Sequence, residues 1–190
     1  SSIYSDSEFK EDVYFKAANI YLTKGNREKA IETIKKIYSK TEVKESFLKQ
    51  VAESYVKEGK FEKAIECIGS VYSDTEAKEG MFIKIANAYL GKGDREKALD
   101  TIRKVYSKSE VKEKFIEDVA KLYFDEGKLD AALSTVNLIN GETEGKLDLI
   151  HKIARIYIDR KESDNAFKAI GNKWCTTDER VNLLVELIQL

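Results

Sequence analysis

The sequence predicts an all-α fold, an α-solenoid of antiparallel helical hairpins that repeat every 34 residues. Three series of residues in phase indicate this period: five tyrosines, four glycines and five alanines. They are Tyr21, Tyr55, Tyr89, Tyr123 and Tyr157; Gly25, Gly59, Gly93 and Gly127; and Ala30, Ala64, Ala98, Ala132 and Ala166. Because a lone hairpin leaves most of its apolar face exposed, the hairpins must stack. Strands are not expected, since apolar residues do not alternate over any useful stretch.

Each hairpin is expected to open with a helix that begins at a hydroxyl residue followed by an acid. The hydroxyl at the N-cap accepts a hydrogen bond from an unpaired backbone N–H, and the acid meets the positive end of the helix dipole. Six such pairs occur: Ser7-Glu8, Thr41-Glu42, Thr75-Glu76, Ser109-Glu110, Thr143-Glu144 and Thr177-Asp178.

The first helix of each hairpin is expected to end at a glycine, and a second helix follows. Glycine suits the left-handed residue after a helix end, where a side chain costs up to about 1 to 2 kcal/mol. In the first unit, Ala30, Ile31, Ile34 and Ile37 recur at helical spacing after Gly25. The small alanine allows the two helices to approach each other closely.

We expect one array over residues 1–190. Its repeats are placed at residues 8–41, 42–75, 76–109, 110–143 and 144–177, and a terminal helix at 178–190. Residues 1–7 are expected to be the tail of a preceding repeat, because residues 3–8 resemble residues 71–76, where a second helix ends. The terminal helix carries an apolar stripe of Val181, Leu184, Val185 and Ile188. It either caps the array or was followed by another repeat.

The charges of the chain almost cancel, with 33 Lys and Arg against 34 Asp and Glu and a net charge of −1. This balance argues against a general binder of nucleic acid or of anionic membranes. The sequence contains no apolar run near 18 residues, so no membrane span is expected. Proline is absent from all 190 residues.

The chain has few of the residues that most often act in catalysis or metal binding, with one histidine and two cysteines. The single histidine, His151, has no paired nucleophile or metal-ligand partner in the sequence, so we interpret it as a groove or surface residue. Cys67 and Cys175 are far apart and lack Cys or His neighbours, which indicates neither a zinc site nor a disulfide framework. We therefore expect no catalysis, no metal and no cofactor, and a reducing, cytoplasmic location.

With Tyr21, Gly25 and Ala30 in one unit, the chain resembles the tetratricopeptide repeat family. The resemblance covers nearly the whole chain and implies a right-handed superhelix. Two features depart from the family pattern. The position of the usual proline is taken by the hydroxyl-acid pairs, and the fifth unit has Lys161 where glycine is expected and Trp174 where earlier units have Tyr38, Tyr72 and Tyr106.

The resemblance implies that the first helices line a concave groove that binds a peptide or a partner helix. Carried over position by position, the groove residues are Phe15, Lys16, Asn19, Leu22, Lys49, Gln50, Glu53, Val56, Ile83, Lys84, Asn87, Leu90, Lys121 and Phe124. Lysines outnumber acids among the lining positions of the first three units, and acids outnumber bases in the last two. An apolar row from Leu22 to Ile158 either anchors a ligand or packs between units.

Some members of the family bind terminal carboxylates through a clamp of lysines and asparagines. Asn19, Gln50 and Lys84 stand at matching places, but Phe15 and Gly80 occupy places where the clamp needs lysine. The clamp is therefore incomplete. Tyr21, Tyr55, Tyr89 and Tyr123 are expected to be buried, and Tyr38, Tyr72 and Tyr106 are also interpreted as packing residues.

The leading hypothesis is a protein-interaction module, scaffold or adaptor whose partner is a protein or peptide. One alternative is a structural segment that self-associates through its terminal helix, as a monomer or weak homo-oligomer. A less favoured alternative is RNA binding by a related array of helical hairpins, which the near-zero charge and the 34-residue period disfavour.

Overall fold

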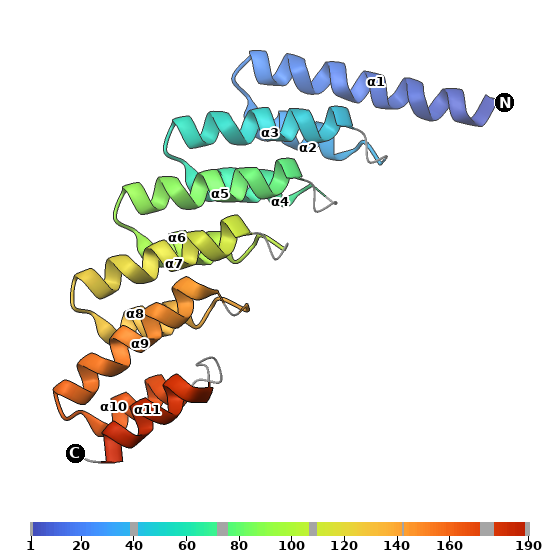
Figure 1. Ribbon diagram of the computed structural model, residues 1–190. Coiled ribbons are helices and arrows are strands. Elements are labelled where there is room, and N and C mark those ends of the chain that lie inside the picture. The colour runs from blue at the N-terminus through green and yellow to red at the C-terminus, as the bar shows by residue number, and fades with distance from the viewer. Residues whose placement is uncertain are drawn as a thin grey trace. The chain divides into compact units, whose positions relative to one another are not determined.

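The computed structural model describes residues 2–38, 42–71, 76–106, 110–141, 143–171 and 177–188. Within these ranges the regular structure is entirely helical and contains no strand (Figure 1). The odd-numbered helices up to α9 each pack against the even-numbered helix that follows, so helical hairpins are the building block. The predicted all-α hairpin repeat is therefore confirmed.

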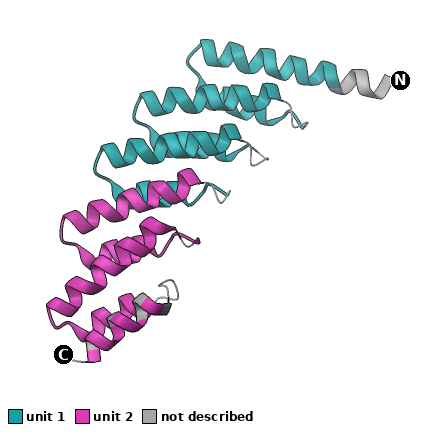
Figure 2. Ribbon diagram, in the orientation of Figure 1, with its two compact units in different colours: residues 1–106 teal, residues 107–190 magenta. Residues whose placement is uncertain are grey.

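The chain divides into two compact units, Ser1–Tyr106 and Ser107–Leu190 (Figure 2). Unit 1 contains α1 (Ser2–Thr23), α2 (Arg27–Lys35), α3 (Glu42–Lys57), α4 (Phe61–Gly69), α5 (Glu76–Gly91) and α6 (Arg95–Ile102). Unit 2 contains α7 (Glu110–Asp125), α8 (Leu129–Val136), α9 (Glu144–Asp159), α10 (Ser163–Gly171) and α11 (Thr177–Ile188). A single array across both units, and its right-handed superhelix, stay predictions.

Four first helices begin at the predicted acid: α3 at Glu42, α5 at Glu76, α7 at Glu110 and α9 at Glu144. At α9 the predicted cap is seen directly, since the Thr143 hydroxyl accepts a hydrogen bond from the Lys146 N–H at 3.2 Å. The caps predicted at Thr41, Thr75 and Ser109 lie outside the described residues. Helix α11 begins one residue early, at the predicted cap residue Thr177.

The predicted start at Ser7-Glu8 is wrong, because α1 already begins at Ser2. In the structure, residues 2–7 are part of α1. The likeness of residues 3–8 to residues 71–76 predicts instead that they are the tail of a separate, preceding helix. Between Ser2 and Glu8 the chain has neither glycine nor proline, the two residues that most strongly stop a helix. The hydroxyl-acid pair alone does not break the helix there.

The same type of turn ends five first helices, namely α1, α3 and α5 of unit 1 and α7 and α9 of unit 2. After α1, the Gly25 N–H bonds the Leu22 carbonyl at 3.0 Å and the Asn26 N–H bonds the Tyr21 carbonyl at 2.9 Å. This pair of bonds is the Schellman motif, which requires a left-handed residue after the helix. Accordingly φ is +76°, +73°, +80° and +73° at Gly25, Gly59, Gly93 and Gly127.

The fifth turn keeps the motif without glycine. Lys161 has a φ of +59°, and its N–H bonds the Ile158 carbonyl at 2.9 Å. The Glu162 N–H bonds the Tyr157 carbonyl, also at 2.9 Å. A side chain in this backbone conformation brings Cβ close to the following carbonyl, so Lys161 stores strain in the turn.

Each second helix contains a buried alanine, and α2 and α6 begin at a side-chain N-cap. The five series alanines are all fully buried, which brings each second helix close to its first helix. Asn26 and Asp94 cap α2 and α6 by accepting hydrogen bonds from the N–H groups of Lys29 and Lys97, each at 3.1 Å. Lys60 and Lys128 stand at the same position of α4 and α8 and make no side-chain cap.

A buried lysine near the start of a first helix ties it to the preceding second helix. The Lys44 ammonium donates to the Ile37 carbonyl at 2.8 Å, and the Lys146 ammonium donates to the Ile139 carbonyl at 2.7 Å. Lys146 is completely buried and Lys44 is 5% exposed. Lys78 makes the same bond to the Val71 carbonyl at 3.1 Å. These lysines share the 34-residue period, so the bond recurs between successive hairpins.

Tyr55 and Tyr89 are buried as predicted, whereas Tyr21 and Tyr123 are only half-buried; Tyr157 is also buried. The second tyrosine series is not packed where the structure describes it. Tyr38 is 97% exposed and Tyr106 is 75% exposed, so their predicted packing role is wrong. In each case the buried residue is the one before, Ile37 or Val105, and the chain leaves the second helix there. Tyr72 lies outside the described residues.

In the part of the chain that the structure describes, no helix combines the length and apolar character needed to cross a bilayer.

Replacing Lys161 by Gly is expected to raise the free energy of unfolding of unit 2 by about 1 kcal/mol, because glycine adopts a positive φ without strain. Urea unfolding followed by circular dichroism measures the change. The matched control is Arg160→Gly, one residue earlier, where φ is −82° and the backbone is right-handed helical. That control should lower the free energy of unfolding by about 1 kcal/mol. Changes of the same sign in both variants would refute the strain assignment.

Replacing Lys146 by Met should destabilise unit 2 by about 1 to 3 kcal/mol, since the buried Ile139 carbonyl then loses its charged donor. Thermal and urea unfolding give this number. Lys168→Met, which changes an exposed lysine on α10, is the control and should stay within about 0.5 kcal/mol of the parent protein. Equal losses in the two variants would show that the buried bond contributes nothing particular.

Candidate functional site

The first helices of unit 1 enclose two neighbouring pockets. The first, here called the aromatic pocket, lies between α1 and α3 and has a volume of about 340 Å³. Two phenylalanines form its floor: the Phe15 ring meets the buried Phe47 ring edge to face, with centroids 6.2 Å apart and planes at 73°. The residues that line the pocket are Phe15, Asn19, Glu42, Val43, Ser46, Phe47 and Gln50.

Amide groups supply the polar edge of the aromatic pocket. The Asn19 side-chain N–H₂ donates to the Phe15 carbonyl of its own helix at 3.0 Å. This bond uses a donor and fixes the rotamer, which leaves the amide oxygen as a hydrogen-bond acceptor. Gln50, on α3, is exposed and offers a second amide group. Val43 is 48% exposed and adds apolar surface.

The second pocket, here called the lysine pocket, lies between α3 and α5 and has a volume of about 460 Å³. Its α5 side includes two small residues, Ala77 and Gly80. Lys84 lies 3.9 Å from a Glu53 carboxylate oxygen, whereas Lys49 pairs with no carboxylate among the described residues. The residues that line the pocket are Lys49, Glu53, Glu76, Ala77, Gly80, Met81 and Lys84.

Six of the fourteen predicted groove residues therefore line one pocket or the other: Phe15, Asn19 and Gln50 the first, and Lys49, Glu53 and Lys84 the second. Six more lie on the first helices of unit 1 outside these linings. Lys16 pairs with Asp12 at 2.6 Å, and Asn87 donates to the Ile83 carbonyl at 2.9 Å. Leu22, Val56, Ile83 and Leu90 are half-buried.

The last two predicted residues, Lys121 and Phe124, lie on α7 in unit 2. Lys121 already pairs with Glu117 at 2.5 Å, and Lys114 lies 3.6 Å from the same carboxylate. Gly145 on α9 makes room for that carboxylate, since a Cβ at this glycine would collide with it. The side chain of Glu117 is 12% exposed and that of Lys121 is 43% exposed, so Lys121 belongs to a partly buried ion pair.

Sequence reasoning missed several pocket residues. Val43 and Ala77 stand at one position of the repeat, in the first turn of α3 and α5, and Phe47 and Met81 stand at another. The sequence pattern identifies the acids Glu42 and Glu76 only as helix starts. The 34-residue register contains a signal for them, because equivalent residues line the same side of successive helices.

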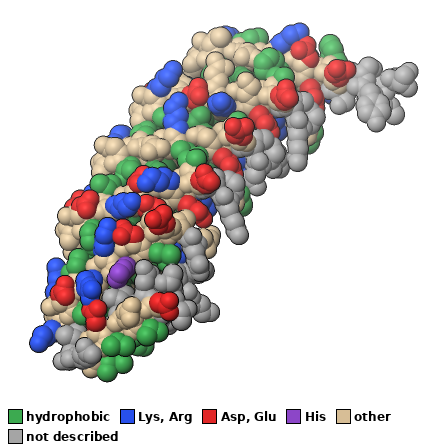
Figure 3. All heavy atoms as spheres, in the orientation of Figure 1, with side chains coloured by type: hydrophobic (Ala, Val, Ile, Leu, Met, Phe, Trp, Pro, Cys, Tyr) green, Lys and Arg blue, Asp and Glu red, His purple; other side chains and the backbone are tan. Residues whose placement is uncertain are grey.

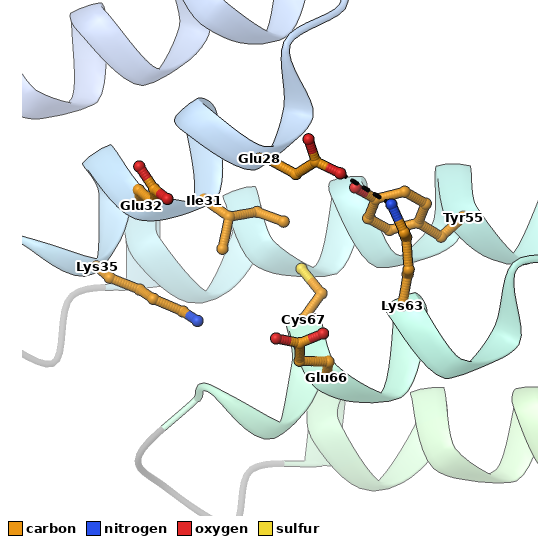
Figure 4. A pocket seen from close by; sticks show the side chains of 8 residues that line it. All are labelled: Glu28, Ile31, Glu32, Lys35, Tyr55, Lys63, Glu66 and Cys67. Atoms are coloured by element: carbon orange, nitrogen blue, oxygen red, sulfur yellow. Dashed lines mark hydrogen bonds and ion pairs between the residues drawn. The ribbon is translucent and has the colours of Figure 1, made fainter.

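The second helices of unit 1 are joined by charge. Between α2 and α4, Glu28 and Lys63 form an ion pair at 2.8 Å, and Lys63 lies 5.9 Å from the centre of the Tyr55 ring (Figure 4). The next hairpin repeats this arrangement: Glu62 pairs with Lys97 at 3.1 Å, and Lys97 lies 5.5 Å from the Tyr89 ring.

A smaller pocket of about 260 Å³ lies beside this pair on the second-helix side (Figure 4). Cys67 lines it, and its thiol donates to the Leu48 carbonyl at 3.4 Å. Burial raises the pKa of the Cys67 thiol to about 12, so the sulfur stays protonated at neutral pH. A protonated, buried thiol is a poor nucleophile. Cys175 lies outside the described residues.

Basic and acidic side chains are interspersed on the face shown in Figure 3. On the first helices of unit 2, Lys114 pairs with Asp118 at 2.9 Å and Lys152 pairs with Asp148 at 2.7 Å. His151 lies half-buried on α9. Among the described residues, no group of three or more His, Cys, Asp and Glu side chains is arranged to hold a metal ion.

The chain was compared with curated sequences, solved structures and family models. No curated protein sequence is significantly similar to the chain. Among solved structures, nearly identical TPR-like repeats from Podosopora anserina are 16% identical, with 94% of this chain and 93% of that chain covered and a TM-score of 0.34. The MamA protein is 17% identical, with coverages of 95% and 91% and a TM-score of 0.34.

A sequence match supports the resemblance at the first hairpin. Residues 11–39 match the sequence model of the tetratricopeptide repeat. This segment runs from the middle of α1 to just beyond the end of α2, and it contains the Tyr21, Gly25 and Ala30 positions from which the resemblance was predicted. The first hairpin is therefore similar to a tetratricopeptide repeat, and the predicted resemblance to that family is confirmed over this segment.

Proposed function

We propose that unit 1 is a non-catalytic protein-interaction module that binds a peptide or partner helix of another protein across the aromatic and lysine pockets. A tetratricopeptide repeat supports an interaction or scaffold module in general. The observation that carries the finer proposal is the convergence of Phe15, Asn19, Lys49, Gln50 and Lys84 on two adjacent pockets. These side chains come from three successive first helices.

The chemistry of the two pockets suits an extended polypeptide. Apolar walls accept a side chain, amide oxygens accept hydrogen bonds from backbone N–H groups, and ammonium groups meet carbonyls or carboxylates. On the second-helix side of the same unit, the ion pairs Glu28–Lys63 and Glu62–Lys97 already satisfy the corresponding charges. The first helices therefore offer the more available polar groups.

The proposal needs neither a cofactor nor a metal, and it includes the cytoplasmic location favoured by the sequence. A scaffold or adaptor role follows if the module holds its partner without changing it. Nucleic acid and membrane are not proposed as partners, since the net charge of −1 supplies no long-range attraction to polyanions.

A second candidate function is self-association through α11. Val181, Val185 and Ile188 are 50%, 45% and 84% exposed and follow one another at helical spacing on one side of this helix. An exposed apolar stripe of this kind is a common protein contact surface. Two copies of α11 packed along this stripe would bury these side chains.

The groove proposal is tested with an array of short peptides probed by the purified protein. Peptides that bind should lose about tenfold in affinity with Lys49→Glu, because this change places an acid where the ligand meets an ammonium. Lys104→Glu changes an exposed lysine of the same unit outside both pockets and serves as the charge-matched control. Fluorescence anisotropy measures the affinities. Binding that is unaffected by Lys49→Glu, or absent from a broad array, would reject the groove.

Self-association is tested by light scattering over a concentration series. If α11 pairs with its own copy, the molar mass should rise with concentration, and Val185→Glu should return it to that of the monomer, since a buried acid opposes an apolar contact. Asn182→Glu adds the same charge at an exposed polar residue of the same helix and is the control. A constant monomer mass in the parent protein would exclude this candidate.

A further inference from the structure

We infer that the groove of unit 1 selects an extended peptide with two defined features: an aromatic or branched apolar side chain for the aromatic pocket, and a carboxylate side chain for the lysine pocket. The inference rests on the proposed function and deepens it, since it names the ligand chemistry of the same surface. It follows from the different linings of the two pockets, which share helix α3.

The aromatic pocket favours an apolar side chain. Its floor consists of the Phe15 and Phe47 rings, and Val43 supplies an exposed aliphatic wall. An aromatic guest gains edge-to-face contacts with such rings in addition to buried area. The charged group of this pocket is the exposed Glu42 carboxylate at its rim, which repels an acidic guest. The ligand carboxylate is therefore directed to the other pocket.

The lysine pocket favours an acid. Four charged groups line it: Lys49, Lys84, Glu53 and Glu76. Glu53 is partly neutralised by Lys84 at 3.9 Å, and Glu76 stands in the first turn of α5, where the helix dipole offsets its negative charge. The Lys49 charge has no carboxylate partner among the residues described in unit 1. A ligand carboxylate at Lys49 forms a charge-assisted hydrogen bond that the free protein lacks.

The repeat fixes the distance between the two ligand features. Packed helices lie about 8–10 Å apart, and an extended chain advances about 3.3 Å per residue. Because the pockets lie on opposite sides of α3, the apolar anchor and the acid should stand about three residues apart in the ligand. Asn19 and Gln50 then face the ligand backbone beside the anchor.

The experiment uses synthetic peptides on an Ala-Ser background, each carrying a Phe or Leu anchor and an Asp or Glu in both chain orders. Separations from one to six residues are compared, together with peptides that carry only the anchor or only the acid. Affinities for the full chain are measured by fluorescence anisotropy. The paired peptide at about three residues is expected to bind at least tenfold more tightly than either single-feature peptide.

Two variants assign each feature to its pocket. Ser46→Trp fills the aromatic pocket and should remove the preference for Phe or Leu over Ala, while Lys49→Gln should remove the preference for Asp or Glu over Asn or Gln. Lys104→Gln is the matched control and should preserve both preferences. Circular dichroism verifies that each variant retains its helical content.

The outcomes separate the two levels of the proposal. Peptides that bind in a manner sensitive to Lys49→Gln but without any preference for the anchor, the acid or their spacing would overturn this inference and leave the groove in place. No saturable binding by any peptide of the set or of the broad array would overturn both. Loss of both preferences in the Lys104→Gln control would also overturn the assignment to the two pockets.

Discussion

The hydrogen bond from a buried lysine to a carbonyl of the preceding hairpin is the interaction on which the stacking depends. Burying an ammonium group without partners costs several kcal/mol, so Lys44 and Lys146 are tolerated only where each meets an acceptor. The Ile37 and Ile139 carbonyls lie just beyond the C-terminal ends of α2 and α8, where the helix dipole attracts a positive charge. Each bond links the first turn of one helix to the end of the helix before it.

This constraint explains why the two sides of unit 1 differ. On the second-helix side, Glu28 and Lys63, and then Glu62 and Lys97, are paired across successive hairpins, and burial with a hydrogen bond to Glu62 raises the pKa of Tyr89. On the first-helix side, Lys44 and Lys78 hold α3 and α5 against the second helices that precede them. The outward side chains of α1, α3 and α5 are left to line the aromatic and lysine pockets, which is where binding is proposed.

The repeat itself was predictable because glycine, tyrosine and alanine each occupy a position that few other residues tolerate. Five turns share one geometry, and even Lys161 follows it at the cost of strain. The buried lysine bond was missed, since a lysine in a charged sequence looks like a surface residue. The start of α1 and the exposure of Tyr38 were predicted wrongly, because local signals do not show which neighbour covers a residue. Residues that line a pocket, such as Val43, could not be predicted because their position depends on how neighbouring helices pack.

Nuclear magnetic resonance of the lysine side chains tests the central claim most directly. At neutral pH the Lys146 ammonium should give a slowly exchanging nitrogen signal with a coupling across the hydrogen bond to the Ile139 carbonyl carbon. That signal is expected because the group is fully buried and its bond to the carbonyl is 2.7 Å long. A Lys146 ammonium that exchanges with water as fast as the exposed lysines, without such a coupling, would contradict the account.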